Sequence, residues 1–350
     1  MTTELFALGL MSGTSLDGLD ICYAKFWREN SVWNFDILEA ETIPYNEIWR
    51  TKLENAFICT AESLAELNTE YGFYLGEKAN EFCTKYTINR LDLIASHGHT
   101  IFHNPAKKYT MQIGDGRAIK IHTNLPTIYD FRVLDVLFGG NGAPLVPIGD
   151  KLLFSKYEAC LNLGGFSNIS FTKEHKRIAF DICPVNIVLN ELAQKLGKEF
   201  DKDGELARTS TADEKLFHKL NSIDFYKLQH PKSLGKEWVE EQIKPLLTNI
   251  NPQIAIATFT EHCAEQIANV LNENSLKNVL ITGGGAYNSY LIERIKQLTT
   301  TEIILPNSTV INFKEALIFA FMGVLNKVGE PNILSSATGS LHDHCSGIWA

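Results

Sequence analysis

Three short turns combine glycines with hydroxyl or amide side chains, and each follows an apolar run of the sequence. They span residues 13–18, 164–168 and 283–288. A turn without Cβ atoms lets successive backbone N–H groups converge on an anion, and Ser, Thr and Asn side chains add donors. One such turn is most simply a tight connection between two elements. Three at strand ends, two of them alike, instead favour the binding of phosphate groups.

The first turn also carries a carboxylate, Asp17. A carboxylate beside a phosphate repels it unless a cation lies between the two groups. Mg²⁺ keeps several of its waters and binds few protein carboxylates. Asp17 is therefore a candidate to hold Mg²⁺ through a bound water.

Asp181 ends the strand-like run "RIAFDI". A carboxylate at the carboxyl end of a strand points into the crevice where α/β proteins bind ligands, and a partly desolvated one can act as a general base. The alternative is a helix-capping role near Pro184, which stands where a first helical turn would begin. The spacing alone leaves both interpretations open.

Further polar candidates lie in "SHGHTIFHNP" and "YDFR". His97, His99 and His103 are close enough in sequence to suggest a metal site, but no nearby Cys or Glu completes a ligand set. We therefore expect them to be pocket walls or structural histidines. Arg132 can bind a carboxylate or a phosphate through its guanidinium fork, and the alternative is an ion pair with a neighbouring aspartate.

The composition limits the class of protein. The 350 residues suffice for two domains, and 45% hydrophobic with 21% charged residues is ordinary for a globular protein. The net charge of -9 and the lack of a basic stripe interleaved with aromatics argue against nucleic-acid binding. The seven cysteines are scattered and form no C-x-x-C, which argues against a zinc ribbon or a disulfide framework and fits a reducing cytoplasm.

No segment has the pattern of a membrane signal. The N-terminal "MTTELFALGL" has no basic region and does not resemble a signal peptide. The late apolar run "EALIFAFMGVLNK" is shorter than the roughly 20 residues of a membrane span, so we expect a buried helix. These observations predict a cytoplasmic protein without a membrane partner. A homodimer is the default expectation for a soluble oligomer, and no pattern in the sequence speaks for it.

The order of elements predicts an α/β fold with an internal repeat. "LFALGLM", the turn "SGTSLDG" and "LDICYAKFW" have the pattern of a strand, a turn and a second strand, and "EACLNLGGFSNISFTKE" repeats it. Two similar hairpins so far apart indicate a duplicated domain. Helical periodicity predicts helices within residues 46–90, 185–197, 213–221, 235–249, 257–273, 289–298 and 312–327.

The block "GLMSGTSLDGLD" resembles the opening signature of the anhydro-N-acetylmuramic acid kinases. Blocks similar to that family follow in the family's order along nearly the whole chain. They are "SHGHTIFHNP", "QIGDGRAI", "YDFRVLDVLFGGNGAPLVP", "LNLGGFSNIS", "FDICPVN", "PKSLGKEW", "TFTEHCAEQI", "TGGGAYN", "FKEALIFAF" and "NILSSATGS".

The resemblance implies an actin-like, ribonuclease H-like fold, in which two lobes of one duplicated design have an ATP cleft between them. On this basis we expect an N-terminal lobe of residues 1–130, a C-terminal lobe of residues 131–327, and a tail, 328–350, that packs back on the first lobe. The resemblance also implies a reaction. With Mg²⁺ as cofactor, ATP, 1,6-anhydro-N-acetylmuramic acid and water give N-acetylmuramic acid 6-phosphate and ADP, in the recycling of cell-wall peptidoglycan.

The resemblance carries roles onto individual residues. The ATP-phosphate loop of the family matches Gly13, Thr14, Ser15, Leu16, Asp17, Gly18, Leu19 and Asp20. Its second phosphate hairpin matches Gly164, Gly165, Ser167 and Asn168, and its glycine turn near the adenosine matches Gly283, Gly284, Gly285 and Asn288. Asp181 matches the base that takes a proton from the water attacking the anomeric carbon, after which O6 receives the γ-phosphoryl group. The candidate sugar contacts are His97, Arg132 and Glu315.

The sequence departs from the family pattern at three places. "FDICPVN" stands where the family has F-D-T-G-P-G-N or close to it, and His99 and Asn141 each stand where the family has glutamine. These departures motivate two alternatives, a non-catalytic sugar or nucleotide sensor on the same scaffold and a kinase for a related sugar. An Asp181→Asn variant separates an enzyme from a sensor, and a panel of sugars separates the two kinases.

Overall fold

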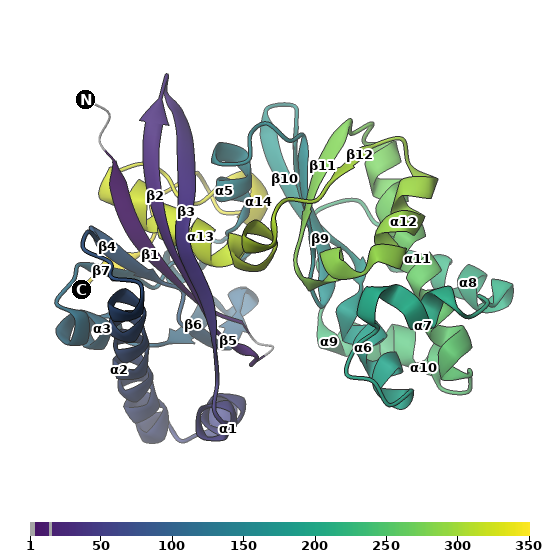
Figure 1. Ribbon diagram of the computed structural model, residues 1–350, viewed down its shortest axis with the longest axis horizontal. Helices are drawn as coiled ribbons and strands as arrows, with labels where there is room; N and C mark the ends of the chain where they lie inside the picture. The colour runs from purple at the N-terminus through teal and green to yellow at the C-terminus, as the bar shows by residue number, and fades with distance from the viewer. Residues whose placement is uncertain (1–3, 14–15) are drawn as a thin grey trace. The chain divides into compact units, whose positions relative to one another are not determined.

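The computed structural model describes residues 4–13 and 16–350, and the chain divides into two compact units. Unit 1 comprises Met1–Leu153 and Phe313–Ala350, and unit 2 comprises Phe154–Asn312 (Figure 1). This division corrects the expected lobe boundaries at 130/131 and 327/328. Residues 131–153 and 313–327 belong to unit 1 because the helices that they form pack against the strands and helices of that unit.

Unit 1 is built on a six-stranded mixed sheet with the order β13-β7-β4-β1-β2-β3. The first three strands form an antiparallel meander. β4 pairs in parallel with β1, and β7 pairs in parallel with β4. The short C-terminal strand pairs antiparallel with β7, so the end of the chain packs back on this sheet. The strands are β1 Leu5–Ser12, β2 Gly18–Glu29, β3 Val32–Pro44, β4 Leu93–Ser96, β7 Thr127–Tyr129 and β13 Ile348–Trp349.

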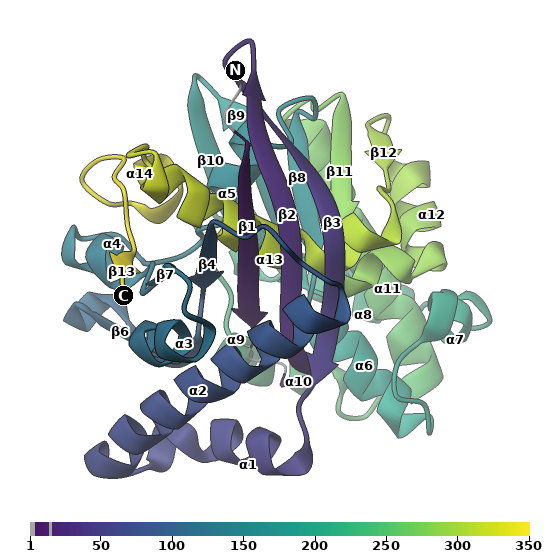
Figure 2. The ribbon, with the colours of Figure 1, turned by 60° about the vertical axis from the view of Figure 1, so that its left-hand side comes forward.

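The alternation of side chains along β1 gives this sheet two covered faces. Leu8 and Leu10 point into a core shared with α2 (Ala61–Lys85). Gly9 points to the opposite face, where an added Cβ would lie 1.9 Å from the Ala316 carbonyl oxygen of α13 (Ser308–Lys327). Figure 2 shows α2 crossing one face of the strands and α13 behind them. Unit 1 is therefore a helix–sheet–helix sandwich.

The other elements of unit 1 surround this sandwich. An antiparallel ribbon, β5 His99–Asn104 with β6 Tyr109–Ile113, extends the chain after β4. The remaining helices are α1 Glu47–Asn55, α3 Gly116–Thr123, α4 Val133–Leu137, α5 Pro147–Leu152 and α14 Ser335–Thr338. Thr60 caps α2 by accepting the N–H of Ser63, which is the start signal expected of a threonine at this position.

Helix α13 is the core helix that the apolar run predicts. Among the described residues it is the one helix long and apolar enough to cross a membrane by length and composition. Its residues from Ala316 to Ala320 are almost fully buried. Gly323 lets it approach Leu93, Ala95 and Ile128 of β4 and β7. Its apolar character is thus explained by contact with the sheet.

Unit 2 is built on a five-stranded mixed sheet with the order β10-β9-β8-β11-β12. Its strands are β8 Ala159–Leu163, β9 Phe166–Lys173, β10 Lys176–Pro184, β11 Asn278–Thr282 and β12 Glu302–Ile304. Its helices are α6 Asn186–Lys195, α7 Glu205–Arg208, α8 Glu214–Asn221, α9 Lys236–Trp238, a π-helix Val239–Ile243, α10 Lys244–Leu247, α11 Pro252–Glu273 and α12 Ser289–Leu298. The long α11 supplies buried side chains to the core together with α6 and α12.

The two sheets repeat one topology, which confirms the duplication that the two hairpins predict. In each unit the first three strands form an antiparallel meander. A fourth strand pairs in parallel with the first strand, and a fifth pairs in parallel with the fourth. The predicted helices are also present, although their ends differ by several residues; α11, for example, begins at Pro252, not at 257. The α/β fold class is confirmed.

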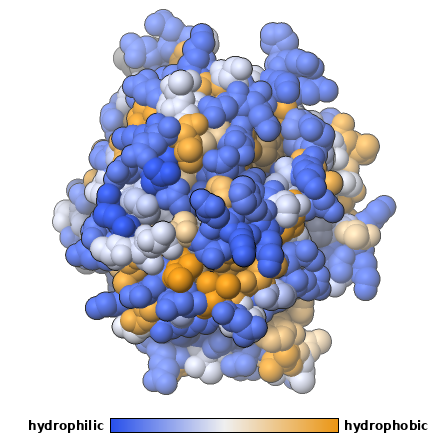
Figure 3. All heavy atoms as spheres, turned by 90° about the vertical axis from the view of Figure 1, so that its right-hand side faces the viewer, coloured by the Kyte–Doolittle hydropathy of each residue, from blue (hydrophilic) through white to orange (hydrophobic). Residues whose placement is uncertain are grey.

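The face of unit 2 in Figure 3 is largely hydrophilic, with small apolar areas between charged side chains. Phe200, Leu228 and Ile254 are among the exposed large apolar residues of this unit. Scattered apolar side chains are ordinary on a protein surface. This face therefore gives no reason to add a partner to the sequence-based expectations.

Candidate active site

The turn between β1 and β2 starts directly from a paired strand end, because Ser12 pairs with Leu19 across the hairpin. Leu16 has a positive φ of 59° and donates its N–H to the Gly13 carbonyl at 3.4 Å. Asp17 is exposed. The predicted donors Thr14 and Ser15 lie outside the described residues. The described part of the turn is thus a tight connection with an accessible carboxylate.

Two residues that follow this turn have clear structural roles. A Cβ on Gly18 would lie 2.6 Å from the Ile43 carbonyl oxygen, so β3 requires glycine there. Leu19 is fully buried in the core under α2. The side chain of Leu19 thus packs in this core, and the nucleotide contact of Leu19 stays a prediction.

Asp20 is half-buried and accepts the Thr42 hydroxyl at 2.5 Å. Burial raises the pKa of the Asp20 carboxyl group, the hydroxyl bond opposes this, and the negative charge of Asp17 raises it further. A cation bound beside Asp20 would favour the ionised form of its carboxyl group. Among the described residues, no group of three or more His, Cys, Asp or Glu side chains is arranged to hold a metal directly.

A chain of buried hydrogen bonds lies beneath the same strand end. Ser12 Oγ lies 2.8 Å from His99 Nδ1 and accepts the Tyr45 hydroxyl at 2.7 Å, and the Tyr45 and Tyr71 hydroxyls are 2.5 Å apart. Burial lowers the pKa of His99 to about 4. The imidazole is therefore neutral at neutral pH and can serve as a hydrogen-bond acceptor.

His97 and Arg132 form a second buried pair. Arg132 Nε donates to His97 Nε2 at 2.9 Å, and Arg132 Nη1 donates to the Gly142 carbonyl at 2.5 Å. His97 Nδ1 lies 2.9 Å from the Gly98 carbonyl, which assigns its proton to Nδ1. Burial, and then the positive charge of Arg132, hold the pKa of His97 well below its ordinary value. Arg132 pairs with His97, so the expected alternative of a simple ion pair does not describe its contacts.

Glu315 lies on α13 and keeps solvent-exposed surface, although protein surrounds it on several sides. Desolvation raises the pKa of its carboxyl group, and the positive charge of Arg132 opposes that rise. The adjacent Lys314 is buried and forms an ion pair with Asp150 at 2.8 Å. Unit 1 thus brings His97, Arg132 and Glu315, which lie more than two hundred residues apart at the extremes, into one electrostatic neighbourhood.

In unit 2 the second hairpin also begins helix α6. The Gly165 carbonyl accepts the N–H groups of Val185 and Ile187, and the Gly164 carbonyl accepts that of Asn186. Gly165 leaves open space beside its Cα, since an added Cβ would meet nothing nearer than 3.8 Å. The turn at these two glycines is therefore accessible, and its backbone is held in place by hydrogen bonds to the first residues of α6.

Ser167 departs from its expected role. Its hydroxyl is fully buried, donates to the Cys183 carbonyl at 2.9 Å and accepts the Cys183 N–H at 3.1 Å. It therefore bridges β9 to the bulge in β10 between Asp181 and Cys183. The Ser167 hydroxyl thus has a structural role inside the unit, and the phosphate contact of Ser167 stays a prediction.

Asp181 lies in β10 directly opposite Asn168 of β9, so two predicted site residues are cross-strand neighbours. The carboxylate is half-buried, and its Oδ2 accepts the Leu234 N–H at 2.8 Å. The Asp181 N–H donates to the Lys232 carbonyl at 3.1 Å. Burial raises the pKa of Asp181, and the Leu234 N–H partly offsets this. The helix-capping alternative finds no support, because this carboxylate accepts from a distant segment.

The third glycine turn follows β11 and the second follows β8. Because these two strands are parallel neighbours, both turns lie at the same end of the sheet, where the strands have their carboxyl ends. Gly283 has a φ of +85°, and a Cβ there would lie 2.6 Å from Asn162 Oδ1. A Cβ on Gly285 would lie 2.7 Å from Leu163 Cβ, whereas Gly284 meets nothing nearer than 3.8 Å. Gly284 is therefore the member of this turn with open space, and the other two are needed for packing.

Asn288 serves as the N-cap of α12, because its Oδ1 accepts the Leu291 N–H at 2.9 Å. The residue is buried, and a Cβ on Gly204 would lie 2.3 Å from its Oδ1. This side chain thus caps a helix, and the nucleotide contact of Asn288 stays a prediction. The sequence carries the signal for this role, since an asparagine just before a periodic run is a helix-start pattern.

Sequence reasoning missed several residues that hold the site together. Tyr45 was not singled out, because a tyrosine at the end of a strand-like run is usually a packing residue. Lys232 and Leu234 lie in "PKSLGKEW", a block noted for its resemblance but given no role. Their contacts with Asp181 use backbone atoms, which leave no signature in residue type.

The duplicated sheet, the glycine turns that follow the first strand of each sheet, and the half-buried acid on β10 define the class of protein: an α/β protein built from two units of one repeated topology. Residues 5–349 match the family described as anhydro-N-acetylmuramic acid kinase. The chain therefore belongs to the anhydro-N-acetylmuramic acid kinase family, and the predicted family is confirmed.

Relatives of this name match nearly the full length of the chain. One from Caldanaerobacter subterraneus subsp. tengcongensis is 33% identical over 97% of this chain and 95% of its own length. One from Bacillus cereus is 29% identical over 96% of each chain. Among solved structures, an activator of 2-hydroxyisocaproyl-CoA dehydratase from Clostridium difficile with bound ADPNP has a TM-score of 0.42 at 14% identity, covering 94% of this chain and 97% of that one.

A ROK family glucokinase from Streptomyces griseus in complex with glucose and AMPPNP also has a TM-score of 0.42, at 9% identity, covering 91% of this chain and 98% of that one.

Proposed function

We propose that this chain opens the 1,6-anhydro ring of anhydro-N-acetylmuramic acid with water and phosphorylates O6 from ATP, with Asp181 as the general base. The observation that supports this assignment is the setting of Asp181, a half-buried carboxylate at a strand end whose orientation is fixed through one oxygen by Leu234. A raised pKa makes the carboxylate a stronger base. Asp181 takes a proton from the water that attacks the anomeric carbon, the bond from that carbon to O6 breaks, and O6 displaces ADP from the γ-phosphorus.

The sugar contacts are assigned to His97, Arg132 and Glu315. The substrate carries a carboxylate on its lactyl group, and an arginine binds a carboxylate through paired N–H donors. Arg132 donates to His97 through Nε and to Gly142 through Nη1, and Nη2 supplies further donors for a ligand. His97 and Gly142 hold the guanidinium in place, which reduces the entropy lost when a ligand binds.

The nucleotide contacts are assigned to the turns that keep open space or exposed groups: Gly13, Asp17, Gly164, Gly165 and Gly284. Mg²⁺ would be held through water by Asp17, with Asp20 beside it, because a nearby positive charge would favour the ionised form of the Asp20 carboxyl group, whose pKa burial raises. Bound Mg²⁺ would neutralise charge on the phosphates during transfer. The other predicted nucleotide residues, Leu19, Ser167 and Asn288 among them, stay part of this proposal, although their side chains also have structural contacts.

In the cell, this activity serves peptidoglycan recycling, and we propose a cytoplasmic location. The free cysteines fit a reducing compartment. A homodimer stays a prediction, which light scattering at several protein concentrations tests.

The decisive experiment identifies the product. The protein is incubated with ATP, Mg²⁺ and anhydro-N-acetylmuramic acid in oxygen-18 water, and the sugar is analysed by mass spectrometry. We expect a ring-opened 6-phosphate with one heavy oxygen at the anomeric position. ATP binding without a phosphorylated sugar would support the sensor alternative, and preference for a different anhydrosugar would support the related kinase.

A further inference from the structure

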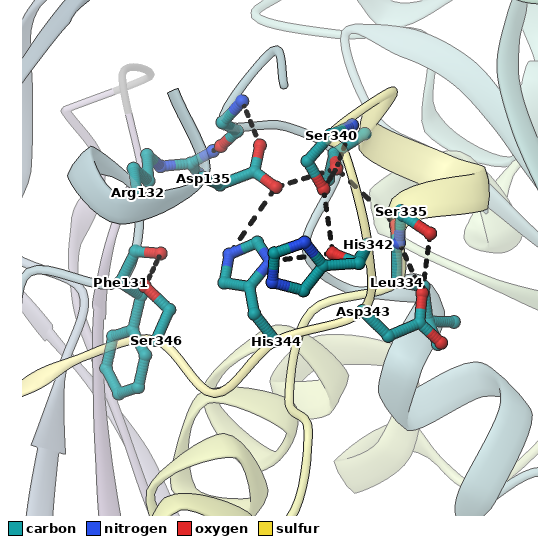
Figure 4. A network of polar contacts seen from close by, with 12 residues as sticks. Phe131, Arg132, Asp135, Leu334, Ser335, Ser340, His342, Asp343, His344 and Ser346 are labelled. Atoms are coloured by element: carbon teal, nitrogen blue, oxygen red, sulfur yellow. Dashed lines mark hydrogen bonds and ion pairs between the residues drawn. The ribbon is translucent and has the colours of Figure 1, made fainter. Parts of the chain in front are cut away.

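A buried carboxylate in unit 1, Asp135, joins two segments that the proposed reaction leaves without a role. Asp135 lies on α4 and is fully buried. One carboxylate oxygen accepts the Gly142 N–H at 2.7 Å, and the other accepts the Thr338 hydroxyl at 2.7 Å (Figure 4). His344 Nε2 lies 3.7 Å from the second oxygen. Asp135 thus connects the loop after α4 to the C-terminal segment.

The loop after α4, residues 139–142, is shaped almost entirely by this carboxylate and its neighbours. The Gly140 N–H donates to the Asp135 carbonyl at 2.9 Å, and a Cβ on Gly140 would lie 2.3 Å from Asp135 Oδ2. The Asn141 N–H donates to the Thr338 carbonyl at 2.8 Å. The sequence "GGN" therefore fits a backbone that must wrap closely around one buried side chain.

The same loop orients Arg132. The Gly142 peptide lies between the two groups, since its N–H donates to Asp135 and its carbonyl accepts Arg132 Nη1. With His97 on Nε, Gly142 fixes the plane of the guanidinium. A displacement of Gly142 would therefore change the direction in which the remaining Arg132 donors point.

The C-terminal segment, residues 335–346, is fastened to this region at several points. Thr338 is 1% exposed, and the Ser346 hydroxyl donates to the Phe131 carbonyl at 2.8 Å. The Phe138 ring packs against His342 and His344, with centroids 4.8 and 5.0 Å apart. These contacts lie on Phe131, the residue before Arg132, and on Phe138, six residues after it, so the C-terminal segment packs against the stretch that carries Arg132.

We propose that the C-terminal segment is part of the sugar-binding machinery, in which Thr338 acts through Asp135 and the Gly142 peptide to position the Arg132 guanidinium. Thr338 is a positioning residue, since it reaches Arg132 only through the other two groups. The inference rests on the proposed function, because it takes Arg132 to contact the sugar. It gives a role to the block "NILSSATGS", which lies more than two hundred residues from Arg132 in sequence.

The test uses Thr338→Val, which keeps the side-chain shape and removes the hydroxyl. The loss of one hydrogen bond to a charged group is expected to raise the KM for anhydro-N-acetylmuramic acid about fivefold to tenfold. The KM for ATP should stay within about twofold, because the contacts of Arg132 do not include the nucleotide turns. Thr338→Ser, which restores the hydroxyl, should return the sugar KM toward that of the native chain.

Thr127→Val is the matched control. Thr127 is a fully buried threonine of unit 1 whose hydroxyl donates to the Leu125 carbonyl and has no contact with Arg132. It should lower the melting temperature without changing the ratio of the two KM values. If Thr338→Val behaves like this control, the inference is wrong. Should Thr338→Val fail to fold, His344→Gln provides the same comparison of KM values, because His344 also lies next to the Asp135 carboxylate.

A double variant separates this inference from the proposed function. Arg132→Lys alone should raise the sugar KM, and Thr338→Val should add little in its presence, because both changes act on one group. An unchanged sugar KM in Arg132→Lys would refute the sugar contact itself. A raised KM in Arg132→Lys with an independent, multiplying effect of Thr338→Val would refute only the positioning role.

Discussion

The two units share a strand order but fix their polar groups in different ways. In unit 1, side chains bind side chains: Ser12 with His99 and Tyr45, and Arg132 with His97. Among the candidate site residues of unit 2, backbone groups bind the polar side chains: Leu234 binds Asp181, and Cys183 binds Ser167. One duplicated scaffold has therefore acquired two kinds of site.

The difference has consequences for chemistry. Side-chain networks with buried histidines respond to protonation, because an imidazole that gains a proton loses its acceptor. Backbone N–H groups do not titrate, so the carboxylate of Asp181 keeps its partner at every pH at which the protein is folded. The base of the proposed reaction is thus held by a donor that does not titrate, whereas the proposed sugar contacts include a buried histidine.

The largest expected effect on the difference between the two units comes from replacing Asp181, the acid of unit 2. Asp181→Asn keeps the shape and the acceptor for Leu234 but cannot take a proton. We expect turnover to fall by about 10²–10⁴-fold, the usual contribution of a general base, with ATP affinity retained in calorimetric titration. Asp213→Asn, which can still cap α8 through Leu216, should leave turnover unchanged. Full turnover in Asp181→Asn would show that the asymmetry between the units has no catalytic meaning.

The second largest expected effect is on the stability of unit 1, where Gly9 of β1 lies close to α13. Gly9→Ala places a Cβ 1.9 Å from a backbone oxygen of α13, and neither backbone can move without disturbing the sheet. We expect the free energy of unfolding to fall by about 3 kcal/mol in urea denaturation. Gly329→Ala, at an open position with a φ of +74°, should cost only about 1 kcal/mol of conformational strain. Equal losses would mean that α13 is not held as closely as the contact indicates.

The pH sensitivity of unit 1 can be measured at His99. Its pKa is about 4 in the folded protein and about 6.5 in the unfolded chain, so the unfolded chain binds the extra proton between these values. The stabilisation is complete above pH 6.5 and is lost as the pH falls to 4, by about 2 to 3 kcal/mol.

His99→Gln should therefore lose less unfolding free energy than the native chain between pH 6.5 and 4. The exposed His122, replaced in the same way, should follow the native curve. Parallel curves for all three proteins would argue that His99 is not buried as a neutral acceptor.

The backbone contact of unit 2 gives the smallest expected effect. Leu234→Pro removes the N–H that stabilises the Asp181 carboxylate, whereas Leu234→Ala retains it. Without that donor the pKa of Asp181 rises, so the acid limb of kcat/KM should move to higher pH by about one unit. The alanine variant should keep the native profile. An identical shift in both variants would assign the effect to the lost leucine side chain.

Several features of the fold are readable from local pattern. The hairpins at the start of each unit, the long helix after residue 60 and the apolar helix near the end all follow from periodicity and turn residues. The unit boundaries were missed because α4, α5 and α13 look like ordinary helices in sequence, and only their packing assigns them to unit 1.

The site residues also divide into features that the sequence shows and features that only packing decides. Asp181 and Arg132 are singled out by the family resemblance, because residue type and spacing alone leave a structural role open for each. For Ser167 and Asn288 the sequence does not reveal the internal partners of the side chains, because a hydroxyl or amide beside a glycine turn suits a ligand and an internal partner equally well. Their partners lie on other segments, which residue type does not reveal.

By itself, the sequence determined the α/β class, the internal repeat, the glycine turns and the family, since each of these depends on residues close together in the chain or on an ordered set of motifs. Tertiary structure alone decided which polar groups face one another. Thr338 meets Asp135, and Leu234 meets Asp181, only because packing of the apolar core brings distant segments together. Hydrophobic burial is not directional, so the pattern that drives folding does not specify these polar pairs; the final geometry of the packed chain does.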